Sequence, residues 1–226
     1  MAPEVGVLFD AGTGIFRARN LIATETLHIF LSHVHLDHSI GLTFLFDVLW
    51  EKTCDVKVHV AEDKIDVINN HLFHPKLFPI KPDFELIPLT NQPYAIGETT
   101  TVEAFELGNH PGGSHGFLMK NGDSSVAYIT DTFADESSPY LSRIQGVDTL
   151  IHECYFPEGW EEHAKLTGHS CLQPVARVAA GVNARRLYLV HINPMDESEG
   201  SNLDLESIHN VFPNTHVAYD ELVIDV

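Results

Sequence analysis

Apolar residues along the chain fall into short runs with two different spacings. Compact or alternating apolar runs predict strands at residues 5–9, 27–31, 56–60, 102–107, 117–120, 125–130, 149–151 and 185–190. Apolar residues at helical spacing predict helices at 39–50, 61–72 and 170–181, the last with Ser170 as its N-cap and Gly181 as its stop. Asn121 and Gly122 predict a hairpin turn, and 215–218 with 222–224 predict a final hairpin. The acidic stretch 196–206 is interpreted as a solvated loop and the start of a helix.

Length and composition favour a single globular domain over residues 1–226. The 226 residues are 44% apolar and 20% charged, and no linker divides them. No apolar run approaches the roughly 20 residues that span a bilayer, and the first ten residues lack the features of a secretory signal. The three cysteines are widely spaced and odd in number, which favours unpaired thiols in a reducing cytoplasm. We therefore expect a cytoplasmic protein with no membrane segment.

The charge balance limits the choice of substrate. Lys and Arg number 13 against 32 Asp and Glu, giving a formal net charge of −19. Proteins that bind a long nucleic acid normally present a basic surface, because phosphate contacts supply most of the affinity. The composition therefore makes nucleic acid an unexpected partner. Small substrates stay possible, since a pair of bound cations is a strong local positive charge whatever the net balance.

The segment that follows the predicted strand 27–31 is rich in metal-binding side chains. It contains His33, His35, Asp37 and His38 within six residues, which is a metal-ligand pattern rather than a core pattern. In an extended segment His33 and His35 point to the same side, so they can share one ion. Asp37 and His38 fall where the backbone turns into a helix, and their different direction suits a second ion.

Further candidates follow later strands. His110 comes directly after strand 102–107 and precedes Pro111 and two glycines, Asp131 follows strand 125–130, and His191 follows strand 185–190. An aspartate in such a position can give one oxygen to each of two cations, although alone it could simply end the strand. All the candidates lie at or just beyond strand ends, so they can converge on one edge of a sandwich.

The string from His33 to His38 resembles the signature of the metallo-β-lactamase fold hydrolases. With Leu36 and Gly41 included, it is similar to the version found in class II cyclic-nucleotide phosphodiesterases. The resemblance implies an α/β fold of the αββα sandwich type, with two mixed β-sheets flanked by helices. It also implies a dinuclear centre, and in some family members a homodimer.

Carried over by this resemblance, the ligands divide into two sets. His33, His35, His110 and a bridging Asp131 would hold one ion, and Asp37, His38, Asp131 and His191 the other. Nitrogen and carboxylate ligands without thiolate fit two Zn²⁺ ions, with Mn²⁺ or Fe²⁺ as competitors. Asp10 is expected either to support a ligand histidine or to cap a turn formed by the glycines at 12 and 14, and His115 to be a loop residue or a supporting one.

Two further segments resemble the phosphodiesterase branch of the family. Residues 152–156 are similar to the Glu-Cys-Ser-Phe of class II phosphodiesterases and to the His-Glu-Ala-Thr-Phe of tRNA 3′-end processing endonucleases. Glu153 is therefore expected to be an orienting carboxylate. Gly168, His169 and Pro174 match a Gly-His-Leu-Thr-Pro of the class II enzymes, and His169 is the candidate general acid. The proline-broken aromatic segment 71–88 also matches a class II outline and is either a lid or a packed loop.

These features predict a metal-dependent phosphodiesterase that cleaves a small diester, a cyclic nucleotide first, with a hydroxide between the two metal ions as the nucleophile. Asp37, Glu153 and His169 are the expected catalytic residues. One alternative is a tRNA 3′-end endonuclease, but the inserted arm of those enzymes is not found and the charge opposes it. A lactonase or thioesterase would keep the metals without needing His169. A non-catalytic metal-binding scaffold would not need an open dinuclear centre.

Overall fold

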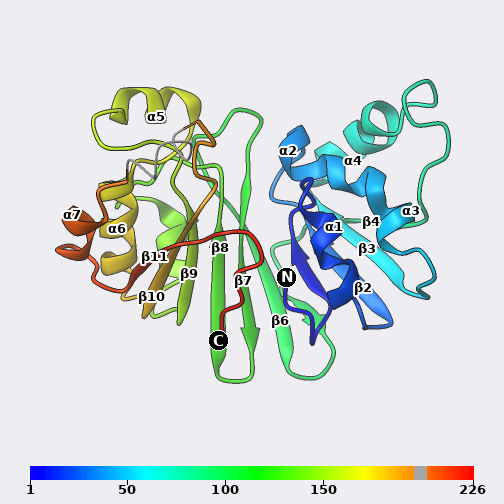
Figure 1. Cartoon of the computed structure of the whole chain (residues 1–226), viewed down its shortest axis with the longest axis horizontal. Coiled ribbons are helices and arrows are strands. Elements are labelled where there is room, and N and C mark those ends of the chain that lie inside the picture. The colour runs from blue at the N-terminus through cyan, green and yellow to red at the C-terminus, as the bar shows by residue number, and fades with distance from the viewer. Residues whose placement is uncertain (196–202) are drawn as a thin grey trace. The chain divides into compact units, whose positions relative to one another are not determined.

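The structure is a computed structural model that describes residues 1–195 and 203–226. The chain divides into two compact units, unit 1 at Met1–Asn91 and unit 2 at Gln92–Val226, which are blue to cyan and green to red in Figure 1. Each unit has its own sheet, its own helices and its own apolar core, and each is described by itself.

Unit 1 is built on a four-stranded sheet with the strand order β1-β2-β3-β4. Its strands are β1 (Val7–Phe9), β2 (Thr26–Phe30), β3 (Asp55–Val60) and β4 (Glu85–Pro88). Its helices are α1 (Ile15–Ala18), α2 (Leu36–Ser39), α3 (Leu45–Val48) and α4 (Ile65–Val67), with 3₁₀ turns at Arg19–Leu21, Ile40–Phe44 and Glu62–Lys64 and a π-helical turn at Ile68–Leu72. All neighbouring strands run parallel. The parallel order follows from the connections, most of which are helical crossovers.

The two faces of β2 carry different side chains. Leu27 and Ile29 are fully buried in a core cluster that includes residues of the flanking helices. His28 and Phe30 alternate with them, and both lie against His59 of β3. Burial lowers the pKa of His59 to about 3, with smaller contributions from His28 and Lys57. His59 is thus a sheet residue, as its place in an alternating strand predicts.

Unit 2 is built on a seven-stranded mixed sheet with the order β11-β10-β9-β8-β7-β6-β5. Its strands are β5 (Tyr94–Ile96), β6 (Thr100–Glu106), β7 (His115–Asn121), β8 (Ser124–Ile129), β9 (Thr149–Glu153), β10 (Arg186–Val190) and β11 (Thr215–Val217). Its helices are α5 (Glu161–Thr167), α6 (Leu172–Gly181) and α7 (Leu205–His209), with a 3₁₀ turn at Pro139–Arg143. Strands β5 to β8 are antiparallel and β8 to β11 parallel.

The core of unit 2 lies between this sheet and α6 (Figure 1). Leu172, Val175, Ala176 and Ala179 recur at helical spacing on α6 and are all buried. The predicted hairpin is present, with Asn121 opposite Ser124 and Gly122 at a φ of 58°. Among the described residues no helix is long and apolar enough to cross a membrane.

Two predicted helices of unit 1 are interrupted. The segment 39–50 consists of the end of α2, a 3₁₀ turn and α3, because the Gly41 N–H donates to the carbonyl of Ala11 (2.6 Å) instead of to its own helix. The segment 61–72 ends in the π-helical turn, where the N–H of Phe73 donates to Ile68 (3.0 Å) and carries Phe73 into the core.

Two predictions for unit 2 are corrected, the N-cap of α6 and the final hairpin. Helix α6 has Cys171 as its N-cap, because the Ser170 hydroxyl donates to the carbonyl of Thr132 (2.6 Å). Strand β11 pairs in parallel with β10, and residues 222–224 form no strand, so there is no final hairpin in this part of the chain. In the acidic stretch, residues 196–202 lie outside the described residues, and α7 begins at Leu205. Strands β4 and β5 and helix α5 had not been predicted.

Candidate metal centre

Unit 1 gathers its candidate ligands within one short segment after β2. Residues 32–35 belong to no helix or strand, and α2 begins at Leu36. The ring centroid of His33 lies 4.4 Å from that of His35 and 4.3 Å from that of His38. His33 and His38 are buried, whereas His35 and Asp37 are exposed. The segment therefore brings three imidazoles and a carboxylate together with one accessible side.

A buried carboxylate fixes the orientation of His38. Its Nδ1 lies 2.8 Å from Asp10 Oδ2, and Asp10 also accepts from the backbone N–H of Ser32 (2.7 Å). An Nδ1–H that donates to a carboxylate leaves Nε2 with a lone pair for a metal ion. That Nε2 lies 3.3 Å from Asp37 Oδ2, so both predicted ligands of one ion face each other. The expected support of a ligand histidine by Asp10 is thus present.

Two glycines let the turn after β1 pack tightly against this segment. The N–H of Ala11 donates to the carbonyl of His38 (2.8 Å). A Cβ at Gly12 would lie 2.4 Å from the carbonyl oxygen of Asp37, and one at Gly41 would lie 2.4 Å from that of Gly12. The glycine-rich turn therefore packs against the start of α2 and holds it in place.

The candidate ligands of unit 2, His110, Asp131 and His191, follow the strands β6, β8 and β10. β8, β9 and β10 are parallel, with Ile129 opposite His152 and Val190 opposite Glu153, so residues just after these strands meet at one sheet edge. Asp131 Oδ2 lies 3.5 Å from His110 Nε2, and Asp131 Oδ1 lies 3.5 Å from His191 Nε2. Each carboxylate oxygen thus faces a different imidazole, which is the arrangement that a bridging ligand needs.

The backbone at these positions is unusual. Asp131 and His191 have φ angles of 42° and 54°, in the left-handed region that non-glycine residues rarely occupy. Such conformations cost free energy and concentrate at functional sites. Gly112 and Gly113 also have positive φ, which gives the turn after His110 its shape.

A backbone carbonyl fixes the orientation of His110. Its Nδ1 lies 3.0 Å from the carbonyl oxygen of Gly168, so its Nε2 is left on the side of Asp131. Gly168 has a φ of 73°, and a Cβ there would lie 2.1 Å from the carbonyl oxygen of Asn109. Only a glycine fits this contact between the two loops.

His169 and Glu153 form a pair next to these ligands. His169 Nδ1 lies 3.2 Å from Glu153 Oε1, and Glu153 also accepts from the N–H groups of Thr132 (3.0 Å) and Tyr155 (3.2 Å). Burial raises the pKa of Glu153, and the contact with His169 opposes this shift. One ligand atom each of Asp131, His169 and His191 lie within 4.8 Å of one another. Glu153 thus orients His169, and His169 lies where it could also hold a metal ion together with Asp131 and His191.

Several residues proved to have roles other than those expected, or had not been singled out. His115 is the first residue of β7 and pairs with Glu106, so it belongs to the sheet. Sequence reasoning missed Ser114, whose hydroxyl donates to the carbonyl of Asp131 (2.7 Å), and Tyr155, which stacks on His169 at 4.9 Å. Ser114 lies four residues after His110, but no local pattern distinguishes it.

The segment 71–88 is a packed part of unit 1. Phe73 is buried in the core, Phe78 and Phe84 lie 5.3 and 5.6 Å from it, and the segment ends in β4. This packing favours the packed loop over the lid.

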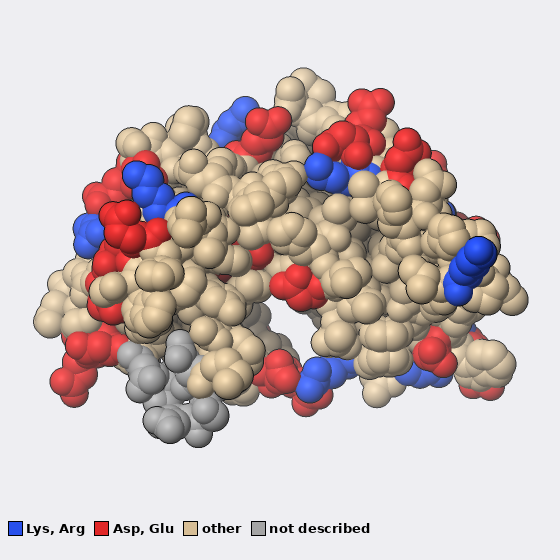
Figure 2. All heavy atoms as spheres, turned by 90° about the horizontal axis from the view of Figure 1, so that it is seen from above, with Lys and Arg blue, Asp and Glu red and all other residues tan. Residues whose placement is uncertain are grey.

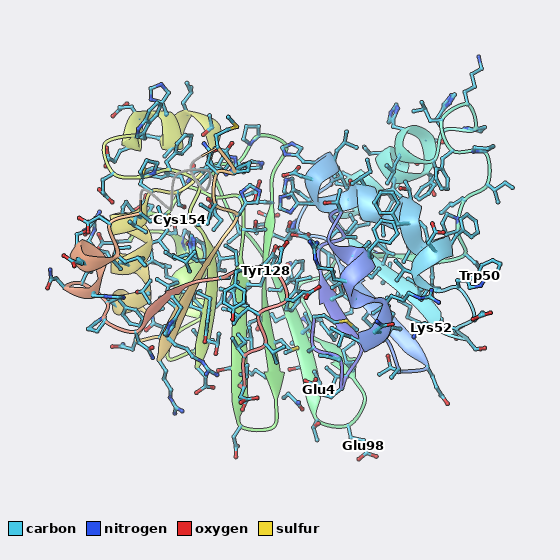
Figure 3. The ribbon with its side chains drawn as sticks, in the orientation of Figure 1. Glu4, Trp50, Lys52, Glu98, Tyr128 and Cys154 are labelled. Carbon is cyan, nitrogen blue, oxygen red and sulfur yellow. The ribbon has the colours of Figure 1, made fainter. Side chains whose placement is uncertain are left out.

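The donor set fits hard or borderline divalent cations. It consists of imidazole nitrogens and carboxylate oxygens, and the three free cysteines lie elsewhere. Cys154, labelled in Figure 3, is fully buried in the core of unit 2, and burial raises the pKa of its thiol. Zn²⁺, Mn²⁺ and Fe²⁺ all suit such ligands.

Comparison with known proteins identifies the family. A model described as "Beta-lactamase superfamily domain" matches residues 6–192. The chain belongs to the beta-lactamase superfamily. It has the metallo-β-lactamase fold and is a metallo-hydrolase, and the fold implies divalent metal ions.

Relatives and solved structures agree with this family. Ribonuclease Z of Azobacteroides pseudotrichonymphae is 26% identical over 264 residues, which cover 97% of this chain and 88% of the relative. The metallo-beta-lactamase fold protein YhfI from Bacillus subtilis has a TM-score of 0.77 at 20% identity, covering 97% of this chain and 87% of that one. Unliganded yeast PDE1 has a TM-score of 0.68 at 14% identity, covering 90% of this chain and 69% of that one.

Proposed function

We propose that this protein is a metal-dependent phosphodiesterase that hydrolyses a small phosphodiester, with a 3′,5′-cyclic nucleotide as the preferred candidate. The observation that carries the proposal is the His169–Glu153 pair, held at 3.2 Å beside the carboxylate of Asp131. A phosphodiester leaves as an alkoxide and needs a proton donor. A lactonase or thioesterase could use the same metals without such a donor.

The metal centre that we propose has two sets of ligands. His33, His35, His110 and Asp131 would hold one ion, and Asp37, His38, Asp131 and His191 the other. Supporting this assignment, Asp10 and the carbonyl of Gly168 turn the Nε2 atoms of His38 and His110 toward the carboxylates of Asp37 and Asp131. We assign Zn²⁺ to both positions, and the ions would supply Lewis-acid chemistry that lowers the pKa of water and offsets the charge of a phosphate.

The residues of the chain then have distinct tasks. Glu153 accepts from Nδ1 of His169 and so fixes the ring, which leaves Nε2 to give a proton to the leaving oxygen. Because Glu153 is fully buried and held by two backbone N–H groups, it cannot swing away when His169 changes its protonation state. Asp37, exposed at the start of α2, would act through the ion that it binds.

Charge favours a small substrate. The net charge is −19, and the Lys and Arg side chains visible in Figure 2 are spread among Asp and Glu side chains. A long RNA would find little counter-charge on the face shown. The match to the ribonuclease Z of A. pseudotrichonymphae also extends over 264 positions although this chain has 226 residues, so the relative carries segments that this chain lacks.

A second candidate is RNA 3′-end processing, which the similarity to ribonuclease Z favours. The two candidates make opposite predictions for substrate size. Metal-loaded protein should hydrolyse cyclic nucleotides faster than a precursor tRNA at physiological salt. The reverse order, or tight tRNA binding at that salt, would assign the endonuclease function instead.

The variant His169→Ala tests the proposal itself. We expect hydrolysis of bis(p-nitrophenyl) phosphate to fall about 10²- to 10⁴-fold, with the metal content by mass spectrometry unchanged. His216→Ala, which removes an exposed imidazole at the sheet edge, is the matched control and should keep full activity. Full activity of His169→Ala would remove the general acid and leave a hydrolase that needs none.

A further inference from the structure

A row of aromatic rings leads away from His169 in unit 2. Tyr155 stacks on His169 at 4.9 Å and meets Phe156 edge to face at 5.0 Å. The ring of Phe156 in turn lies 6.0 Å from Trp160, with only 8° between their planes. The row therefore connects the candidate proton donor with the indole ring of Trp160, the N-cap residue of α5.

The outer end of this row faces solvent. Trp160 is 47% exposed, whereas Tyr155 and Phe156 are half-buried. The flat indole of Trp160 is well suited to stack against another ring. Besides Phe156, the indole of Trp160 contacts the ring of His163, with 4.9 Å between the ring centroids.

Hydrogen bonds fix the backbone of the segment that carries the two outer rings, Phe156 and Trp160. The N–H of Phe156 donates to the carbonyl of Ser170 (3.1 Å), and the carbonyl of Trp160 accepts from Ala164 in the first turn of α5 (2.9 Å). The N–H of Gly159 donates to Glu161 Oε1 (3.0 Å), and this hydrogen bond closes the turn that contains Trp160. A ring that stacks here would find a preformed surface and lose little free energy to ordering.

Charge around the indole selects against polyanions. Glu158, Glu161 and Glu162 lie within two residues of Trp160 and are all exposed. Their carboxylates would repel the successive phosphates of a nucleic acid strand but not a single uncharged base. A neutral ring next to His169 is the chemistry that these surroundings favour.

We propose that Phe156 and Trp160 form a stacking site for the base of a nucleoside phosphodiester. The site rests on the proposed function, since it places the base on the side where His169 would protonate a leaving nucleoside oxygen. It narrows the substrate class from small diesters in general to those that carry a nucleobase. Stacking of bases on aromatic side chains is sequence-tolerant, so the site does not select one base.

Fluorescence tests the site without requiring activity. Trp50 and Trp160 are the two tryptophans of the chain, and Trp50 lies just after α3 in unit 1 and is 66% exposed (Figure 3). In the Trp50→Phe protein we expect adenosine, but not ribose, to quench the emission of Trp160 to saturation. Phe156→Leu in the same background should weaken adenosine binding about tenfold, whereas Phe46→Leu, an exposed phenylalanine of α3, should not. Quenching that rises linearly without saturation would overturn the site.

Kinetics separates the stacking site from the proposed function. The measurement compares kcat/KM for 3′,5′-cyclic AMP with kcat/KM for the base-free methyl riboside 3,5-cyclic phosphate. In Trp160→Leu we expect the ratio of the first to the second to fall about tenfold, through a higher KM for cyclic AMP. Trp160→Phe should restore most of this ratio. An unchanged ratio would overturn the site while the phosphodiesterase stands. A wild-type protein that hydrolyses no diester would overturn the proposed function, and the adenosine titration would still decide the site.

Discussion

The two units hold their histidines in different ways. In unit 1 the four candidate ligands come from six consecutive residues, and they are held by Asp10 and by the close packing of Gly12 and Gly41. In unit 2 the three candidates come from the ends of three strands, and Asp131 and His191 adopt strained backbone conformations. The first set depends on one turn and the second on the register of a whole sheet. Substitutions should therefore act locally in unit 1 and more widely in unit 2.

The largest difference in metal content and activity is expected between the variants Asp131→Ala and His35→Ala. Asp131 faces two imidazoles at 3.5 Å, so Asp131→Ala should remove both ions and lower activity by more than the roughly 100-fold that loss of a supporting residue costs. His35 is exposed and would bind one ion, so His35→Ala should keep the other. Metal counting after dialysis, with rates on bis(p-nitrophenyl) phosphate, checks both. Equal metal loss in the two variants would contradict the bridging role.

Variants of the two supporting carboxylates, Asp10 and Glu153, should separate metal binding from catalysis. Asp10→Ala removes the acceptor that orients His38, so metal affinity should fall about 10- to 100-fold in a chelator competition. Glu153→Gln keeps an acceptor for the N–H groups of Thr132 and Tyr155 but no longer stabilises a protonated His169. Its kcat should therefore fall while its metal affinity stays that of the wild type. A Glu153→Gln protein with weakened metal binding would place Glu153 behind a ligand instead.

Two glycines of unit 2 test how far its backbone tolerates an added side chain. Gly168→Ala would place a Cβ at 2.1 Å from Asn109 at a φ of 73°, and the free energy of unfolding should fall by about 2 kcal/mol or more. Gly181→Ala, in the last turn of α6 with open space around it, should be neutral or stabilise by up to about 1 kcal/mol. Urea unfolding of the metal-free proteins measures both. Equal stability of the two variants would mean that the Gly168 loop adapts freely.

The smallest effect concerns buried histidines outside the centre. Burial lowers the pKa of His152 to about 4, so between pH 6.5 and 4 the unfolded chain binds a proton that the folded chain does not. Its contribution to stability is complete above pH 6.5 and is lost as pH falls, by about 1.4 kcal/mol at pH 5.5. His152→Gln should lose less stability than the wild type between pH 7.5 and 5.5 in metal-free urea titrations. The same slope in both proteins would show that His152 is protonated in the folded state.

The same contrast explains what could be predicted from the sequence. His33 to His38 form one backbone run, so the alternation of an extended segment and the start of a helix were enough to group them. Asp131 and His191 are brought together by the register of β8, β9 and β10, and their grouping needed the family resemblance. The pairing of Glu153 with His169 was not predicted, because it depends on how the loop after β9 meets the start of α6.

Errors in the predicted fold have the same origin. Apolar spacing predicted one helix at 39–50. This spacing contains no information about the carbonyl of Ala11, which accepts a hydrogen bond from the N–H of Gly41. Ser170 has the side chain of a good N-cap, yet its hydroxyl is taken by Thr132 from another loop. Short-range rules fail where a contact distant in sequence offers the same group a better partner.

Anomalous diffraction from crystals of the zinc-loaded protein tests the central claim most directly. We predict two zinc peaks per chain, both about 2.0–2.2 Å from the carboxylate of Asp131, with His33, His35 and His110 on one ion and Asp37, His38 and His191 on the other. A single peak, or two peaks that leave Asp131 unbound, would contradict the dinuclear centre.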